Sequence, residues 1–167
     1  ANQRLLQLVE DLLEVARSEA GRIAIEVKDI DIREPIQSAV DELVLLARKK
    51  AISLSYEAND TAHVLADERR VKEIMVNLAG NAIKYTPEKG RVRVFHELRG
   101  KELITHIEDT GYGIPQEAQS KIFEKFYRVQ SPETRDITGT GLGLFIVKQL
   151  VEKMHGTISF KSEQGKG

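Results

Sequence analysis

A long helical pattern in the middle of the chain is followed directly by two segments of strand pattern. Apolar residues recur at helical spacing between Asp67 and Thr86, and Asp67 is a residue type that caps helix N-termini. Residues 91–97 and 103–108 then alternate between apolar and polar side chains, and residues 99–101 between them predict a hairpin turn. Further helical and strand patterns lie on both sides of this unit. Their order favours an α+β sandwich with helices on one face of a mixed sheet.

The flanking patterns predict one helix that stands apart and several shorter elements. Six apolar residues form a seam on an amphipathic helix that ends at Gly21: Leu5, Leu8, Val9, Leu12, Leu13 and Ala16. Such a helix is marginal alone and needs a partner. The other predicted elements are strands at 23–27, 30–32, 52–56 and 157–161, helices at 34–50 and 142–154, a short helix opened by Pro115, and a loop at 130–138. We expect residues 1–21 to belong to a separate, partial domain and residues 22–167 to form one domain.

Composition and charge exclude several classes of protein. The formal net charge of −1 over 167 residues argues against binding to nucleic acid through phosphate neutralisation. The chain has no cysteine, which excludes a disulfide framework and a thiolate metal site. No apolar run approaches the about 20 residues needed to span a bilayer, and residues 1–4 show no signal-peptide pattern. We expect a cytoplasmic protein, and any membrane anchor of the full-length protein would lie outside this sequence.

Two asparagines lie four residues apart in the long central helix. Asparagine is a poor helix former, yet Asn77 and Asn81 share one narrow stripe with Lys84. One interpretation of this stripe, which also contains Arg70 and Glu73, is a solvated face, although such faces usually carry only Lys and Glu. The other is a magnesium–triphosphate site, because amide oxygens suit Mg2+ and a lysine supplies positive charge for phosphates. The stripe alone leaves both interpretations open.

Two glycine-rich segments point to a ligand that touches the backbone. The segment 109–115 (DTGYGIP) follows a predicted strand and places a carboxylate beside a backbone that can approach a ligand closely; an ordinary turn is the alternative. The segment 139–144 (GTGLGL) begins a predicted helix, where free N–H groups favour phosphate. It does not match a Rossmann fingerprint, because a polar run rather than a strand precedes it. Each segment alone is a weak indication.

Four ordered segments together resemble the catalytic, ATP-binding domain of bacterial sensor histidine kinases. Residues 77–87 (NLAGNAIKYTP) resemble its N box, residues 109–115 its first glycine box, residues 122–128 (IFEKFYR) its phenylalanine box and residues 139–144 its second glycine box. The resemblance covers residues 30–167, and residues 1–21 are similar to the second helix of the family's dimerisation hairpin. It implies a two-layer α/β sandwich of the Bergerat type, shared by the GHKL superfamily, preceded by an isolated helix.

The resemblance also implies roles for individual residues of the N box and the first glycine box. Asn81, assisted by Asn77, would hold Mg2+, while Lys84 and Tyr85 would contact phosphate. Asp109 would accept a hydrogen bond from the adenine amino group, and the glycines after it would shape the base pocket. ATP and Mg2+ are therefore the expected ligands.

The phenylalanine box and the second glycine box receive the remaining roles. Arg128 would stabilise the transferring γ-phosphoryl group, and residues 130–138 would form a mobile lid over the nucleotide. Phe123 and Phe126 are expected to pack in the core. The implied catalytic residues are Arg128, Lys84 and Asn77. The implied ATP-binding residues are Asn77, Asn81, Lys84, Tyr85, Asp109, Gly111, Gly113, Ile114, Arg128, Thr138, Gly139, Thr140, Gly141, Leu142, Gly143 and Leu144.

The implied reaction is transfer of the ATP γ-phosphoryl group to a histidine on a dimerisation domain, for relay to an aspartate of a response regulator. The full-length protein would be a homodimer. Hydrolysing relatives place a glutamate at the position of Asn77 to activate water, and an amide cannot accept that proton. This favours a kinase. Glu73, one turn earlier, keeps ATP hydrolysis open as an alternative, and a nucleotide-sensing module without kinase activity is another.

The acceptor histidine is expected outside this sequence. His96-Glu97-Leu98-Arg99 matches the first four residues of the family's acceptor motif, His-Glu-Leu-Arg-Thr-Pro, but lies in a predicted strand rather than a helix. We therefore expect the chain to bind ATP without phosphorylating itself, and we expect the apolar seam of the first helix to favour self-association. The family continues with one more strand after Gly165-Lys166-Gly167.

Overall fold

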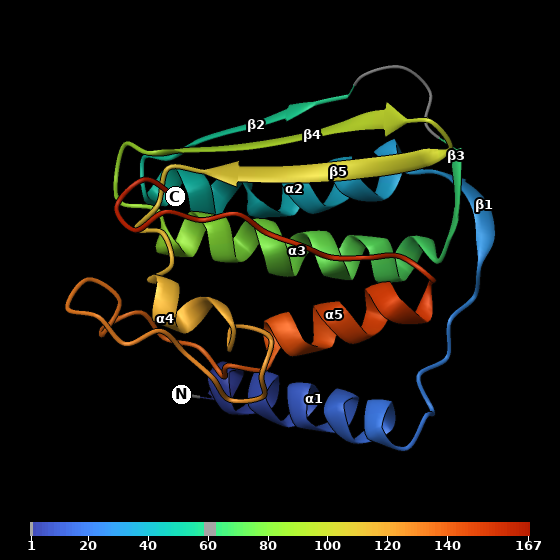
Figure 1. The fold of residues 1–167 in the computed structure, drawn as a ribbon, viewed down its shortest axis with the longest axis horizontal. Coiled ribbons are helices and arrows are strands. Elements are labelled where there is room, and N and C mark those ends of the chain that lie inside the picture. The colour runs from blue at the N-terminus through green and yellow to red at the C-terminus, as the bar shows by residue number, and fades with distance from the viewer. Residues whose placement is uncertain (1, 59–62) are drawn as a thin grey trace.

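Helices and strands form separate layers in the computed structural model, which describes residues 2–58 and 63–167 (Figure 1). The helices are α1 (Asn2–Glu19), α2 (Arg33–Lys49), α3 (Glu68–Tyr85), α4 (Gln116–Gln119) and α5 (Gly143–Lys153). The strands are β1 (Lys28–Asp31), β2 (Ser53–Glu57), β3 (His63–Ala66), β4 (Arg91–Arg99) and β5 (Glu102–Asp109). Helices α2 and α3 lie under one face of the larger sheet, α5 lies below α3, and α1 is farthest from the sheet (Figure 1). The expected α+β sandwich, with one further helix outside it, is confirmed.

The larger sheet has the strand order β2-β4-β5 and is mixed. β2 runs parallel to β4, and β4 forms the expected antiparallel hairpin with β5, with Gly100 in its turn at a φ of +63°. Directly opposite residues of an antiparallel pair share a face, so the pairing of Val92 with Asp109 puts both side chains on the helix side. β1 and β3 pair with each other in a separate antiparallel ribbon.

Helix α3 joins two apolar clusters. The helix begins after Asp67 as expected, because the Asp67 side chain caps it by accepting a hydrogen bond from the Arg70 N–H at 3.2 Å. The first cluster lies between the sheet, α2 and α3, and its completely buried side chains are Ile36, Ala39, Ala79, Ile83, Val92 and Val94. The second cluster joins α1, α3 and α5 and contains Val15, Ile23, Ile74, Leu142, Ile146, Val147 and Leu150. One capped helix is therefore fixed from both sides.

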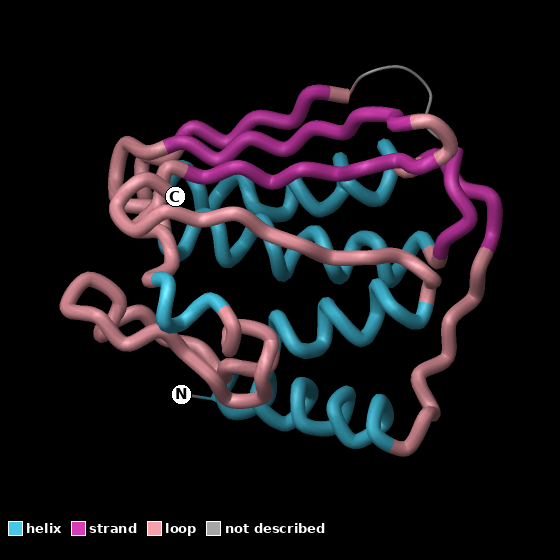
Figure 2. Tube along the Cα trace, in the orientation of Figure 1, coloured by secondary structure: helices cyan, strands magenta, loops and turns pink. Residues whose placement is uncertain are grey.

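Two predicted strands are wrong, and one strand was not expected. Residues 23–27 and 157–161 run as loops and belong to neither sheet (Figure 2), whereas β3 forms at 63–66. In both loops the alternation reflects burial, because Ile23 belongs to the second cluster and Ile158 packs against it. Alternation reports which side chains face a core, whereas a strand also needs a hydrogen-bonded neighbour.

Candidate nucleotide-binding site

The N box and the second glycine box lie against each other. Helix α3 carries the N box, and α5 begins within the second glycine box. A Cβ atom on Gly143 would lie 2.4 Å from Asn77 Oδ1, and one on Gly139 would lie 3.1 Å from Lys84 Nζ. A side chain at position 143 would therefore displace the amide of Asn77 from its present place. Two motifs that are distant in the sequence meet at one place.

The stripe on α3 that contains the asparagines is partly covered by other elements near both of its ends. Near its N-terminal end, Arg70 has a side chain only 12% exposed, and it contacts Glu14 of α1 at 2.9 Å and Glu73 at 2.7 Å. Asn81 is half-buried, and the second glycine box covers the C-terminal end. The interpretation of this stripe as a solvated face is therefore wrong.

Asp109 stands at the end of β5 on the side of the sheet that faces α3. Its Oδ1 accepts a hydrogen bond from the Gly111 N–H at 2.8 Å. Burial raises the pKa of the Asp109 carboxyl, and the hydrogen bond from Gly111 partly offsets this shift. A half-buried carboxylate accepts hydrogen bonds only, so its remaining acceptor capacity suits a ligand that donates, such as an amino group.

The first glycine box is held between the end of α3 and the C-terminal turn. The Tyr112 N–H donates to the Tyr85 carbonyl at 3.1 Å, and the Tyr112 carbonyl accepts from the Gly165 N–H at 2.7 Å. A Cβ atom on Gly111 would lie 2.7 Å from the Tyr85 carbonyl oxygen. The backbone beside Asp109 is therefore packed too closely for a side chain at position 111.

The C-terminal turn supports the rest of this box, a role that the sequence did not reveal. The Ile114 N–H donates to Ser162 Oγ at 2.8 Å. Gly113 has a φ of +65°, and a Cβ atom there would lie 2.1 Å from the Glu163 carbonyl oxygen. Ser162 and Gly165 follow the last apolar alternation, and a serine and a glycine at the chain end carry no pattern that predicts such a contact.

The loop 130–138 contains neither helix nor strand, as expected, and Arg128 lies at its start. Arg128 Nη2 donates to the Ile137 carbonyl, whereas its Nε is buried with no hydrogen-bond partner among the described residues. Thr134, which is 4% exposed, closes a turn by donating to the Val129 carbonyl at 3.0 Å. The guanidinium thus links the two ends of the loop and retains donor capacity.

The second glycine box is divided between the surface and the core. Thr138, just before it, is exposed, and Leu144 is half-buried, whereas the Leu142 side chain is completely buried in the second apolar cluster. Thr140 Oγ1 donates to Asp11 Oδ2 of α1 at 2.7 Å and accepts from the Leu142 N–H at 3.3 Å. The Leu142 side chain is therefore closed to a ligand, and its N–H and carbonyl already have partners in Thr140 and Ile146.

The phenylalanine box contacts the second glycine box through its backbone. The Phe126 N–H donates to the Gly141 carbonyl at 2.9 Å, and both residues have positive φ angles, +63° and +74°. The Phe126 ring is 59% exposed, so the expectation that it packs in the core is wrong. The left-handed backbone that makes this contact turns the side chain outward. Phe123 is half-buried and meets Phe160 edge to face, with 5.9 Å between ring centroids.

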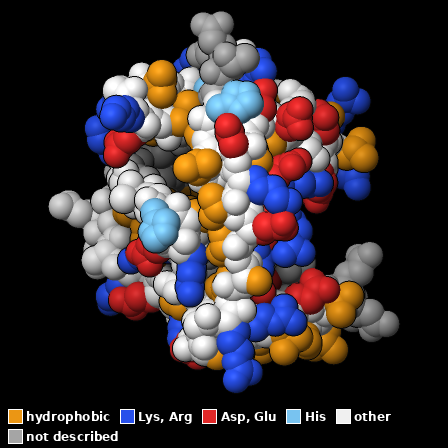
Figure 3. Space-filling model, turned by 90° about the vertical axis from the view of Figure 1, so that its right-hand side faces the viewer, with side chains coloured by type: hydrophobic (Ala, Val, Ile, Leu, Met, Phe, Trp, Pro, Cys, Tyr) orange, Lys and Arg blue, Asp and Glu red, His pale blue; other side chains and the backbone are white. Residues whose placement is uncertain are grey.

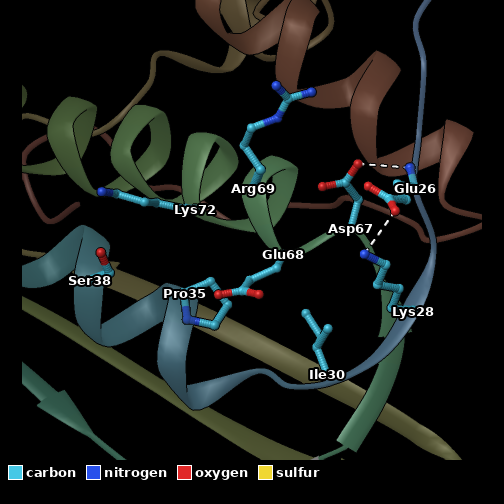
Figure 4. A pocket seen from close by; sticks show the side chains of 9 residues that line it. All are labelled: Glu26, Lys28, Ile30, Pro35, Ser38, Asp67, Glu68, Arg69 and Lys72. Carbon is cyan, nitrogen blue, oxygen red and sulfur yellow. Dashed lines mark hydrogen bonds and ion pairs between the residues drawn. The ribbon is translucent and has the colours of Figure 1, made fainter.

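Two hollows lie at opposite ends of α3. The smaller, about 220 Å3, separates the first glycine box from the loop 130–138 and is lined by residues such as Tyr112 and Glu133. The larger, about 550 Å3, lies at the N-terminal end of α3, is lined by no residue of the four boxes, and has the Lys28–Glu26 ion pair at its edge (Figure 4). The boxes therefore converge away from the larger hollow, toward the C-terminal end of α3.

Acidic and basic side chains are interspersed on the face of the molecule that carries β1 and β3 (Figure 3).

Residues 66–167 match the sequence profile of a family described as histidine kinase-, DNA gyrase B- and HSP90-like ATPases. This chain belongs to that family. Among relatives, the chain is 36% identical over 172 residues to the circadian input-output histidine kinase CikA of Synechococcus elongatus. It is 34% identical over 174 residues to the signal transduction histidine-protein kinase BarA of Escherichia coli K12. These alignments cover 100% and 98% of this chain but only 22% and 18% of the relatives, so the chain spans about a fifth of their length.

Solved structures of histidine kinases have the same fold as this member of the ATPase family. Full-length ShkA in complex with AMPPNP matches with a TM-score of 0.81 and 32% identity, over 97% of this chain and 34% of that one. ThkA in complex with the response regulator TrrA matches with a TM-score of 0.72 and 27% identity, over 92% and 42%. The expected Bergerat-type fold is confirmed. By length and hydropathy, none of the helices within residues 2–58 and 63–167 qualifies as a membrane span.

Proposed function

We propose that this chain is the ATP-binding catalytic part of a sensor histidine kinase and transfers the γ-phosphoryl group of ATP to a histidine on a dimerisation domain. The observation that carries this proposal is the approach of the N box to the second glycine box, where Asn77 meets Gly143 and Lys84 meets Gly139. Amide oxygens, an ammonium group and backbone N–H groups at a helix start converge there. These groups bind a metal-bound triphosphate.

The N box would hold the metal and the phosphates. Asn81, assisted by Asn77, fits Mg2+, because amide oxygens are hard neutral ligands that complement phosphate oxygens. Bound there, the ion would neutralise charge on the β- and γ-phosphates. Lys84 and Tyr85 would contact the phosphates from the last turn of α3. The N–H groups of Gly139, Gly141 and Gly143 would complete the phosphate cradle.

The adenine and the transferring group would be held by residues outside the N box. Asp109 would accept a hydrogen bond from the adenine amino group, in a pocket shaped by Gly111, Gly113 and Ile114. Arg128 would stabilise the negative charge that moves with the γ-phosphoryl group, which its orphaned Nε supports. The loop from residue 130 to Thr138 would cover the nucleotide.

Transfer to a histidine is favoured over hydrolysis by the amide at position 77. The carboxylate closest to it in the helix, Glu73, is bound to Arg70 at 2.7 Å, and Arg70 also contacts Glu14. The Glu73 carboxylate is held by Arg70, which argues against Glu73 as a substitute for the missing water-activating group. Arg128, which would stabilise the transferring group, would have no task in a module that only senses nucleotide.

Helix α1 would be the second helix of the dimerisation hairpin, and residues 22–167 would be the catalytic domain. The α1 side chains Leu5, Leu6, Val9, Leu12 and Leu13 are exposed, and a homodimeric helical bundle in the full-length protein would bury them. His96 lies in β4 and is only 2% exposed, which argues against it as the phosphate acceptor. The acceptor would lie on the other hairpin helix, for relay to a response-regulator aspartate.

The test is phosphotransfer to a separate hairpin domain. The chain is incubated with γ-labelled ATP and Mg2+, alone and with an intact hairpin domain that carries the acceptor histidine. We expect acid-labile label on the added hairpin and none on the lone chain, and we expect Arg128→Ala to remove most of it. Phosphate release without label on the hairpin would favour an ATPase, and label on His96 would overturn the assignment of the acceptor.

A further inference from the structure

Helix α3 ends without the glycine that closes many helices. Its C-cap residue, Thr86, is extended, with φ −93° and ψ 130°, so the last carbonyls need donors from elsewhere. The Ile83 and Lys84 carbonyls both accept hydrogen bonds from Lys50 Nζ, at 3.0 Å and 2.6 Å. The Tyr85 carbonyl accepts from the Tyr112 N–H of the first glycine box at 3.1 Å. Three successive carbonyls at the end of the N box are thus satisfied from two sides.

Lys50 reaches this place because α2 and α3 pack side by side under the sheet (Figure 1). It is the residue that follows α2, and its side chain is half-buried against the end of α3. Burial lowers the pKa of the Lys50 ammonium group, and Glu88 partly offsets this shift. A half-buried ammonium with two carbonyl acceptors is a specific contact. The neighbouring Lys49 side chain, in contrast, is exposed.

We propose that Lys50 is a positioning residue for the nucleotide site, which fixes the last turn of α3 so that Lys84 and Tyr85 face the phosphates. This inference rests on the function proposed above. The carbonyl end of a helix carries partial negative charge, which disfavours a nearby triphosphate. Lys50 offsets that charge and also orders the turn from which Lys84 projects. Position 50 lies outside all four boxes, so no sequence motif predicts this role.

The contact is separable from the stability of α3. The helix is anchored through Ala79 and Ile83, whose side chains are completely buried in the first cluster. Removal of the Lys50 ammonium leaves this apolar packing in place and frees only the Ile83 and Lys84 carbonyls. We therefore expect Lys50 to affect nucleotide affinity more than folding.

The test compares Lys50→Met with the matched variant Lys49→Met. Calorimetric titration with ATP and Mg2+ should show that Lys50→Met binds about tenfold more weakly, while Lys49→Met binds as the unchanged chain does. Lys50→Arg should restore most of the affinity, because a guanidinium also donates to carbonyls. Urea unfolding of each variant measures the folded fraction. If Lys50→Met does not fold, Lys50→Gln serves in its place and should bind with intermediate affinity.

A double-mutant cycle with Lys84→Ala distinguishes an effect of Lys50 on the position of Lys84 from a general loss of structure in the nucleotide site. If Lys50 acts through the last turn, Lys50→Met should weaken binding much less in the Lys84→Ala background than in the unchanged chain. Equal loss in both backgrounds, or unchanged affinity in Lys50→Met, would overturn the inference. Failure of the unchanged chain to bind ATP would instead defeat the proposed function, so the two failures are distinguishable.

Discussion

The contact of the sheet with α2 and α3 is apolar, whereas the contact of α1 with the rest of the molecule relies on polar pairs. The first cluster contains six completely buried apolar side chains from the sheet and the two helices. Among the described side chains of α1, Val15 is the buried apolar one. Its other contacts include Glu14 with Arg70 at 2.9 Å and Ser18 with Gln149 at 2.9 Å. These polar groups can exchange their partners for water at small net cost, which apolar groups cannot.

This difference indicates that α1 detaches more easily than any element of the sandwich. The N box and Asp109 sit on the apolar layer, which fixes their geometry. The second glycine box lies at the boundary, because Thr140 donates to Asp11 of α1 while Leu142 is buried in the core. The apolar layer thus carries most of the candidate site, and a replaceable polar contact joins it to α1.

The largest expected effect on the free energy of unfolding comes from a substitution within the apolar layer. Ile83→Ala should lower the free energy of unfolding by about 3 kcal/mol, because the side chain is completely buried and leaves a cavity. Val15→Ala in α1, which removes one carbon fewer, should cost only about 1–2 kcal/mol, because the helix can also shift to fill the space. Urea unfolding of both variants measures the difference. Equal losses would remove the distinction between the two regions.

The next effect tests whether the apolar layer positions the base pocket. Asp109→Asn should weaken ATP binding by at least about tenfold, because an amide can present a donor to the adenine amino group, and such a mismatch costs about 1–3 kcal/mol. The fold should remain intact, since the amide oxygen can still accept from the Gly111 N–H. Calorimetric titration with an ATP analogue measures the loss, and unchanged affinity would contradict the assignment.

The pH dependence of Asp109 has a defined sign. Burial raises the pKa of this carboxyl, so its contribution to stability is present below its unfolded pKa and is lost as pH rises through the folded pKa. At neutral pH the nucleotide-free Asp109→Asn variant should therefore be at least as stable as the unchanged chain. ATP binding, which needs the ionised carboxylate, should weaken as pH falls through the raised pKa. Thermal unfolding and titrations between neutral and acidic pH check both statements.

A smaller effect is expected at the polar contact of α1. Glu14→Gln removes the charge that meets Arg70, and amide hydrogen exchange in α1 should become about tenfold faster while exchange in α3 stays the same. Glu10→Gln, an exposed change on the same helix, is the control and should leave both rates unchanged. Faster exchange in α3 as well would show that α1 and the sandwich unfold together.

The smallest effect on stability is expected on the outer face of α1. Leu5→Lys and Leu13→Lys should change the free energy of unfolding by less than about 0.5 kcal/mol, because these side chains are 64% and 51% exposed. Light scattering should nevertheless show less self-association than in the unchanged chain. Association that is insensitive to both changes would place the contact elsewhere on the molecule.

Much of the candidate site was predictable from the sequence, because each box combines a local pattern with a chemical requirement. Asp67 caps α3 as its residue type and position predict, and Asp109 follows its strand into the glycine turn. The predictions fail where the tertiary structure does not follow the local pattern of apolar residues. Ile158 lies in a segment of strand alternation without belonging to a sheet, and Phe126 is turned outward by its left-handed backbone.

The helices, the β4–β5 hairpin and the order of the boxes follow from short-range features, because spacing, caps and turn residues act within a few positions of the chain. The contacts that assemble the site join residues that are far apart in the chain. Lys50 reaches the end of α3, Asp11 reaches Thr140, and Asn77 meets Gly143 only because the layers pack as they do. Such contacts depend on the relative placement of whole elements, which burial of apolar faces decides and no local pattern records.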